Sequence, residues 1–223
     1  MFESKEDQPK IEKFHPQESL GFYSHVIFPR ICDIFMRTTF LEPYRRELLA
    51  KASGEILEIG FGTGLNLTHY PPNVRRLTTV DANRGMERRA KERIKQSGIE
   101  VDQRFLNCAE LPFEDDTFDC VISSWTLCSI DDVDQALAEV YRVLRPTGQF
   151  LFLEHGLSPE PKIQKWQRRL NWLEMRLAGG CRLDRNIKSI VTAQPFASVA
   201  LNEFSLGTFP KTHSFMYRGA ATK

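Results

Sequence analysis

The feature that most constrains this chain is a run of alternate glycines placed directly after a short apolar segment. Residues 56–59 predict a buried strand, and the sequence continues Gly60-Phe61-Gly62-Thr63-Gly64. Glycine at every second position lets a ligand approach the backbone closely where the strand turns. The dinucleotide fingerprint needs its third glycine one place later, at Leu65, and no Lys-Ser or Lys-Thr pair follows to form a phosphate-binding loop. The spacing therefore points away from NAD and ATP.

A carboxylate ends the next apolar run. Residues 77–80 predict a second strand, and Asp81 follows at its end. At the carboxyl edge of a parallel sheet, such a side chain can accept both hydrogen bonds of a ribose diol. NAD enzymes share this residue, and an ordinary glycine-rich turn is the alternative interpretation of the loop. The strand, the glycine turn, the helix start and the acid together favour a ligand site.

Strand-like and helix-like patterns alternate after residue 55. Strands are expected at 56–59, 77–81, 101–106, 118–123, 149–153, 198–204 and 211–217, and helices at 86–97 and from 131 to 144. This alternation predicts an α/β protein with a doubly wound, mainly parallel sheet, closed by an antiparallel hairpin. A chain of 223 residues fits a single domain. Its expected parts are a helical cap (1–50), a ligand-binding core (55–157), a lid insertion (158–197) and the closing hairpin (198–223).

Composition excludes several classes of partner. Thirty Lys and Arg balance 29 Asp and Glu, so no overall field attracts nucleic acid, and none is expected as a partner. No signal peptide and no apolar run near 18 residues is found, which predicts a cytoplasmic protein. The cysteines are odd in number and form no CxxC pair, so free thiols and no metal are expected. They are Cys32, Cys108, Cys120, Cys128 and Cys181.

Three segments taken in order carry a family resemblance. Residues 58–64 with Asp81 resemble motif one and the following acidic site of class I S-adenosylmethionine-dependent methyltransferases. Residues 109–119 and 142–148 are similar to the subgroup that contains the quinone-biosynthesis C-methyltransferases. The resemblance covers about residues 55–153 and implies a seven-stranded Rossmann-like methyltransferase fold. It also implies S-adenosylmethionine as cofactor, S-adenosylhomocysteine as product and no metal.

The resemblance also assigns residues to the cofactor. Those expected to bind it are Glu58, Gly60, Gly62, Gly64, Asp81, Ala82, Cys108, Ala109, Glu110 and Ser124. At the end of the third strand the subgroup often has Asp-Ala, whose acid contacts the adenine amino group, whereas this chain has Cys108-Ala109. Backbone groups there and packing on Ala82 are the expected substitute.

The acceptor pocket is expected after the fourth and fifth strands, since both ends open at the edge that carries the glycine loop. Trp125 and Cys128 follow the fourth strand, and His155 follows the fifth. His155 is the candidate catalytic base, because imidazole titrates near neutrality, although a structural histidine is an equal alternative. A cysteine such as Cys128 is more often a small buried filler than a ligand. Aromatic residues of the two helical segments are expected to cover the pocket as lids: Phe22, Tyr23, Trp166 and Trp172.

The later chain resembles a narrower group, the methyltransferase-like thiol S-methyltransferases. The resemblance rests on residues 125–129, on Glu154-His155 and on residues 179–185. It implies methyl transfer to the sulfur of a small thiol or sulfide. N-methylation of phosphatidylethanolamine, C-methylation of a quinone precursor and a non-catalytic S-adenosylmethionine-binding module remain alternatives. Arsenite methylation is a remote one, because the cysteine spacing gives it little support.

The segment 160–178 predicts an amphipathic helix with apolar residues on one face and basic residues around it. Such a helix can lie on an anionic membrane, and a weak membrane-surface contact is one expectation. A lid packed over the pocket is the other, since most amphipathic stripes face a core. Sequence leaves the oligomeric state open.

Overall fold

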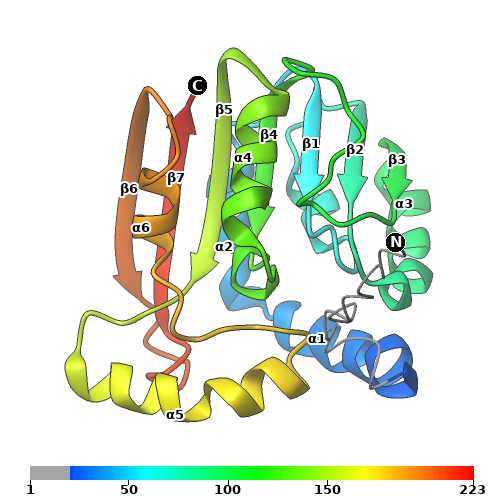
Figure 1. Cartoon of the computed structure of the whole chain (residues 1–223). Coiled ribbons are helices and arrows are strands. Elements are labelled where there is room, and N and C mark those ends of the chain that lie inside the picture. The colour runs from blue at the N-terminus through cyan, green and yellow to red at the C-terminus, as the bar shows by residue number, and fades with distance from the viewer. Residues whose placement is uncertain (1–20) are drawn as a thin grey trace, which may run out of the picture.

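Seven strands form one sheet in a computed structural model of the protein, which describes residues 21–223 (Figure 1). The strand order is β3-β2-β1-β4-β5-β7-β6, and β7 is antiparallel to both of its neighbours. This confirms the predicted doubly wound, mainly parallel sheet with a closing hairpin. The strands are β1 (Ile56–Ile59), β2 (Arg76–Val80), β3 (Glu100–Arg104), β4 (Phe118–Ser124), β5 (Leu144–His155), β6 (Ser198–Ser205) and β7 (Phe215–Thr222).

Helices cover both faces of the sheet. The α-helices are α1 (Phe28–Met36), α2 (Glu42–Leu49), α3 (Glu87–Ser97), α4 (Val133–Val143), α5 (Pro161–Leu177) and α6 (Ile187–Thr192), and the short helical segments are η2 (Tyr23–Ile27), η3 (Thr39–Leu41), η4 (Leu65–His69), η5 (Arg84–Met86) and η6 (Leu127–Ser129). Residues 1–20, which belong to the predicted cap, lie outside the described part of the chain.

The apolar strands divide their side chains between two cores. Phe150 and Phe152 pack with the α4 and α6 side, whereas Leu151 and Leu153 pack with the α2 and α3 side. All four side chains are almost fully buried. This alternation follows from the two-residue period of a strand, because neighbouring side chains point to opposite faces.

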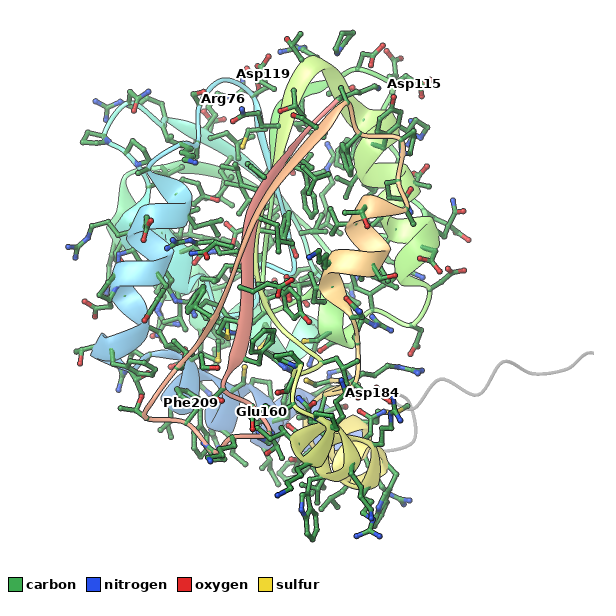
Figure 2. All side chains as sticks on the ribbon, turned by 90° about the vertical axis from the view of Figure 1, so that its left-hand side faces the viewer. Arg76, Asp115, Asp119, Glu160, Asp184 and Phe209 are labelled. Atoms are coloured by element: carbon green, nitrogen blue, oxygen red, sulfur yellow. The ribbon has the colours of Figure 1, made fainter. Side chains whose placement is uncertain are left out.

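The parallel strands all end at one edge, which is crossed by helices. In Figure 1 their arrowheads point down toward α1 and α5, which lie below the sheet. Figure 2 shows the same strand direction from the side. Arg76, Asp115 and Asp119 lie at the end where the parallel strands begin, and Glu160 and Asp184 lie at the opposite end. We call this lower end the carboxyl edge. In open α/β sheets it is where ligands bind.

The strand ends and the lid insertion differ from the sequence expectation, and β5 begins at Leu144 instead of residue 149. The last strand begins at Phe215 instead of residue 211, because Lys211 to Ser214 form a turn in which His213 donates to the Pro210 carbonyl oxygen. In the predicted lid insertion, α5 crosses the carboxyl edge, but α6 joins the helical layer through the buried Ile187 and Val191. Among residues 21–223, no helix has the length and apolar character needed to cross a bilayer.

Candidate active site

The glycine loop lies between the ends of β1 and β2. Gly60, Gly62 and Gly64 have φ angles of +69°, +57° and +78°, a region that side-chain-bearing residues rarely occupy. The Gly60 amide donates to the Val80 carbonyl oxygen at 2.7 Å. A Cβ atom added at Gly62 would meet just the Gly60 carbonyl oxygen, at 3.9 Å. The loop is therefore fixed to β2 and leaves open space above Gly62.

Asp81 closes this loop from the second strand. Its Oδ2 accepts from the Gly62 amide at 2.7 Å, and its Oδ1 accepts from the Asn83 amide at 2.7 Å. Burial raises the pKa of Asp81, and these two hydrogen bonds lower it in part. A carboxylate has about four lone-pair positions, so each oxygen retains one for a ligand diol.

Glu58 lies beneath the loop in a buried polar network. The Tyr70 hydroxyl donates to Oε2 at 2.6 Å, and the Asn66 amide donates to Oε1 at 2.7 Å. Asn66 also contacts the Ser124 hydroxyl at 2.9 Å and accepts from Arg45 at 2.7 Å. Burial raises the pKa of Glu58 to about 7, although the hydrogen bonds and the Arg45 charge oppose this. The network joins the predicted cofactor residues Glu58 and Ser124 across the ends of β1 and β4.

The expected adenine end of the site follows β3. Cys108 and Ala109 are buried, whereas Ala82 and Glu110 are exposed. The Ala109 amide donates to the Asn107 side chain at 3.0 Å. Burial raises the pKa of the Cys108 thiol to about 12, so it stays neutral near pH 7. The Asp81 charge adds to this rise, so the Cys108 thiol lies near the carboxylate that follows β2.

The backbone turns sharply at Trp125, directly after β4. Its φ is +51°, which is an outlier for a bulky residue and marks a conformation that the surroundings impose. Its amide donates to the Leu153 carbonyl oxygen at 2.8 Å, and the next amide, of Thr126, donates to the Glu154 carboxylate at 2.9 Å. The Arg45 guanidinium lies 4.5 Å from the Trp125 ring centroid. The ring is thereby held at the carboxyl edge.

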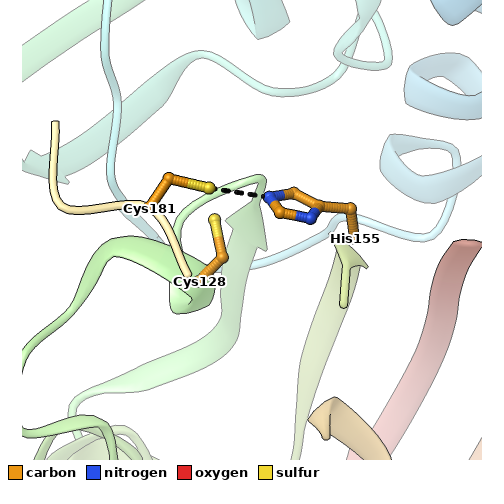
Figure 3. A group of neighbouring side chains, drawn as sticks. All are labelled: Cys128, His155 and Cys181. Atoms are coloured by element: carbon orange, nitrogen blue, oxygen red, sulfur yellow. Dashed lines mark hydrogen bonds between the residues drawn. The ribbon is translucent and has the colours of Figure 1, made fainter. Parts of the chain in front are cut away.

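Three sulfur- and nitrogen-bearing side chains converge behind this turn (Figure 3). Cys128 comes from η6, His155 ends β5, and Cys181 follows α5. Their side-chain ligand atoms all lie within 4.8 Å of one another, and His155 Nε2 is 3.0 Å from Cys181 Sγ. All three residues are buried. The buried His155 Nδ1 has no hydrogen-bond partner among the described residues.

The charges in this cluster are coupled. A hydrogen bond from Cys181 outweighs burial and, with the His155 charge, holds the pKa of Cys128 well below its ordinary value. Burial lowers the pKa of His155, but the neighbouring Cys128 raises it overall. Burial and Cys128 together raise the pKa of Glu154 to about 8. Sequence reasoning identified Cys128 and His155 separately and missed Cys181 as their partner. No spacing signal marks Cys181 as their partner, because the three residues come from separate segments.

The two lid segments touch each other and the glycine loop. On α1, Asp33 accepts from the Thr63 hydroxyl at 2.6 Å and from Arg93 at 2.7 Å. The Tyr23 hydroxyl donates to the Leu177 carbonyl oxygen of α5 at 2.7 Å. The N-terminal segment therefore spans from the cofactor loop to α5.

The other predicted lid aromatics face outward. Phe22 is 71% exposed, Trp166 56% and Trp172 67%, so the structure does not support these three as pocket walls. The reason lies in Gln167, which is fully buried and donates to the carbonyl oxygens of Gly156 at 3.0 Å and Thr212 at 2.9 Å. This polar anchor turns the tryptophan side of α5 into solvent. A hollow of about 290 Å³ lies elsewhere, between α2 and the β5-β7-β6 face.

Comparison with known proteins agrees with the fold and the loop. A family model described as a methyltransferase domain matches residues 57–152. Thiol S-methyltransferase TMT1B of Rattus norvegicus is 31% identical over 175 residues, which cover 72% of this chain and 70% of that protein. Phosphatidylethanolamine N-methyltransferase of Cereibacter sphaeroides is 33% identical over 128 residues, covering 53% of this chain and 63% of that protein.

Solved structures share the architecture over nearly the whole chain. The N-methyltransferase NodS of Bradyrhizobium japonicum, in complex with S-adenosylhomocysteine, superposes with a TM-score of 0.66 at 16% identity. The alignment covers 94% of this chain and 99% of that one. With its glycine loop, its Asp81 and these relatives, the chain belongs to the class I S-adenosylmethionine-dependent methyltransferases.

Proposed function

We propose that the protein transfers the methyl group of S-adenosylmethionine to the sulfur of a small thiol or of sulfide. The observation that carries this is the length of the match to the rat thiol S-methyltransferase. Its 175 residues exceed the matched domain at 57–152. The similarity therefore includes segments outside the matched methyltransferase domain. The match to the phosphatidylethanolamine enzyme is shorter, at 128 residues.

The reaction needs alignment more than acid–base machinery. The acceptor sulfur attacks the methyl carbon in line, the sulfonium C–S bond breaks, and S-adenosylhomocysteine leaves as a neutral thioether. The thiol loses its proton before or during attack, and a thiol of pKa about 8.5 is a few per cent ionised at neutral pH. The glycine loop and Asp81 would hold the cofactor, and α1 and α5 would exclude water at the carboxyl edge.

An acceptor panel tests this proposal. The full chain is given labelled S-adenosylmethionine with hydrosulfide, a small alkyl thiol, phosphatidylethanolamine vesicles or a demethylated quinone. We expect methyl transfer to the two sulfur acceptors, and none with a Gly62→Val variant, whose side chain occupies the open space above the loop. Turnover confined to the lipid or the quinone would overturn the thiol assignment.

One specific observation favours an amphipathic acceptor as the second candidate. The large apolar side chains that are exposed among the described residues gather on η2, α1 and α5 at the carboxyl edge. They are Phe22, Ile27, Ile31, Ile34, Phe35, Trp166, Trp172, Leu173 and Leu177. On α5, five basic residues accompany one acid, Glu174. We propose that this surface, the edge patch, contacts an anionic membrane, which would bring lipid-soluble acceptors to the site.

A further inference from the structure

The cluster of Cys128, His155 and Cys181 has the features of a metal site rather than of three separate fillers. Its residues come from three segments that are far apart in sequence, and each presents its ligand atom to the other two. Two sulfur atoms and one imidazole nitrogen form a soft donor set, which suits zinc. Carboxylates are absent from the set, so calcium and magnesium do not fit it.

The spacing of the donor atoms needs little change to hold one ion. Zinc lies about 2.3 Å from thiolate sulfur and about 2.0–2.1 Å from imidazole nitrogen, so ligand atoms in a tetrahedral site are about 3.3–3.8 Å apart. Here all three atoms lie within 4.8 Å of one another, and Nε2 is 3.0 Å from Cys181 Sγ. Small side-chain rotations therefore bring the three atoms to a common centre.

The charge balance also fits a buried ion. Two thiolates and one Zn²⁺ sum to zero, which satisfies the requirement that buried charges be paired. The guanidinium of Arg185 lies next to the cluster, because it donates to the carbonyl oxygens of Leu127 and of Ile130, the latter at 2.7 Å. These backbone contacts hold the arginine in place independently of the cluster.

The cluster adjoins the site of methyl transfer. Cys128 stands two residues after Thr126, whose hydroxyl contacts the Gly60 carbonyl oxygen at 3.4 Å. The segment that leads to Cys181 packs against α1, because a Cβ atom added at Gly179 would lie 2.7 Å from the Phe28 ring. One side of the cluster therefore faces the region between the glycine loop and α1.

We propose that Cys128, His155 and Cys181 bind one Zn²⁺ ion and that the fourth position of this ion takes the acceptor sulfur. Three protein ligands and one open position are the arrangement of catalytic zinc sites. His155 is then a ligand, in place of the general base expected from sequence. The open-position part rests on the proposed thiol methylation, whereas the metal site itself does not.

Methyl transfer to a zinc-bound acceptor needs no further reagent. The acceptor thiol displaces a zinc-bound water and gives its proton to solvent, so that it binds as a thiolate. Its sulfur then attacks the methyl carbon, the sulfonium C–S bond breaks, and the neutral thioether product leaves the ion for water. No oxidant or reductant takes part.

Cobalt titration tests the metal site directly. Co²⁺ is added to the purified full chain in a metal-free buffer that contains a phosphine reductant, and thiolate-to-cobalt absorption is followed. We expect one equivalent to bind to the wild type and to Cys120→Ser, whose buried thiol lies in β4 outside the cluster. Cys128→Ser and Cys181→Ser should bind at least about 100-fold more weakly, since even losing an outer partner costs about 10- to 100-fold. Equal binding by all four proteins, or none by the wild type, would overturn the site.

Three further measurements separate the ligand role from the function. His155→Gln should lose cobalt affinity together with turnover; unchanged cobalt binding with lost turnover would return His155 to the role of base. A small alkyl thiol should shift the cobalt spectrum of the wild type, and an unchanged spectrum would refute the open position. Thiol methylation by a metal-free Cys181→Ser variant at the wild-type rate would uphold the proposed function and refute the zinc step. Metal binding without thiol methylation would uphold the metal site and refute both the proposed function and the zinc step.

Discussion

Gly62 of the cofactor loop and Gly98, which follows α3, form a matched pair for substitution. Gly62 and Gly98 both have positive φ, +57° and +71°, and a Cβ atom would meet no close neighbour at either. Alanine at each position should lose about 1–2 kcal/mol of unfolding free energy from left-handed strain. The Gly62→Ala variant should also lose S-adenosylmethionine affinity, because its methyl group enters the space above the loop. Isothermal titration calorimetry of both variants checks this, and wild-type affinity in Gly62→Ala would contradict the loop assignment.

Glu58 should make stability depend on pH. Its pKa is about 7 in the folded protein against an ordinary value of 4.5, so between these pH values the folded state holds the extra proton. This contribution is fully present below pH 4.5 and is lost as the pH rises through 7, an effect of about 3 kcal/mol. Glu58→Gln should remove this contribution, whereas that of Glu154, whose pKa is also raised, remains.

Urea unfolding without cofactor at several pH values measures this dependence. The matched control is Glu55→Gln, since Glu55 is exposed and adjoins the start of β1. We expect the unfolding free energy of the control to fall with pH as the wild type does, and that of Glu58→Gln to fall less. Parallel curves for all three proteins would show that Glu58 does not titrate in this range.

At the scale of single residues, local chemistry predicted the cofactor side well and the acceptor side less so. The positive φ values of the loop follow from a motif that is contiguous along the chain, and Asp81 ends the next strand, which pairs with β1. Cys181 could not be paired with His155 in the same way, because the fold alone brings them together. Spacing rules recognise clusters within one turn or loop and do not detect a convergence of three segments.

Among the elements, α1 is tied to the glycine loop mainly through Asp33. Burial by itself raises the pKa of Asp33, but hydrogen bonds from Arg93 and Thr63 lower it overall, so the carboxylate is charged. Asp33→Ala should loosen α1 by about 1.5–3 kcal/mol, the range for hydrogen bonds to charged groups. Hydrogen exchange of α1 amides should accelerate and the KM for S-adenosylmethionine should rise. Asp102→Ala in β3, an exposed ion pair, is the control, and unchanged exchange in Asp33→Ala would contradict the tie.

The helix α5 shows why an element can be predicted correctly and its orientation missed. The amphipathic spacing of residues 160–178 correctly indicated a helix over Pro161–Leu177. Periodicity assigns the apolar face to the interior, yet here Gln167 is the buried side chain, through contacts with the loops after β5 and before β7. A polar residue that satisfies backbone groups from distant segments outweighs the apolar stripe. Such partners cannot be read from the helix sequence.

For the whole molecule, the edge patch predicts association with anionic vesicles. Trp166 and Trp172 are its largest side chains, and basic residues surround them. Replacing both tryptophans by alanine should weaken vesicle binding by about 2–4 kcal/mol, roughly the cost of two apolar side chains. Sedimentation with phosphatidylserine vesicles measures the loss. The control is Lys91→Ala, an exposed lysine of α3 that is not part of the edge patch. Equal sedimentation of all three proteins would contradict a membrane contact.

The Tyr23–Leu177 and Asp33–Thr63 contacts have a kinetic consequence. Because one stretch of chain contacts both the glycine loop and α5, we expect it to move when spent cofactor is exchanged and to open the acceptor side at the same time. Cofactor exchange and acceptor entry then depend on the same movement of this N-terminal segment, which acts as a single gate. Both ligands must be enclosed together before methyl transfer. Initial-rate plots should therefore intersect, as in a ternary-complex mechanism, and parallel lines would contradict it. Opening of the gate, rather than methyl transfer, would then be the rate-limiting step of turnover.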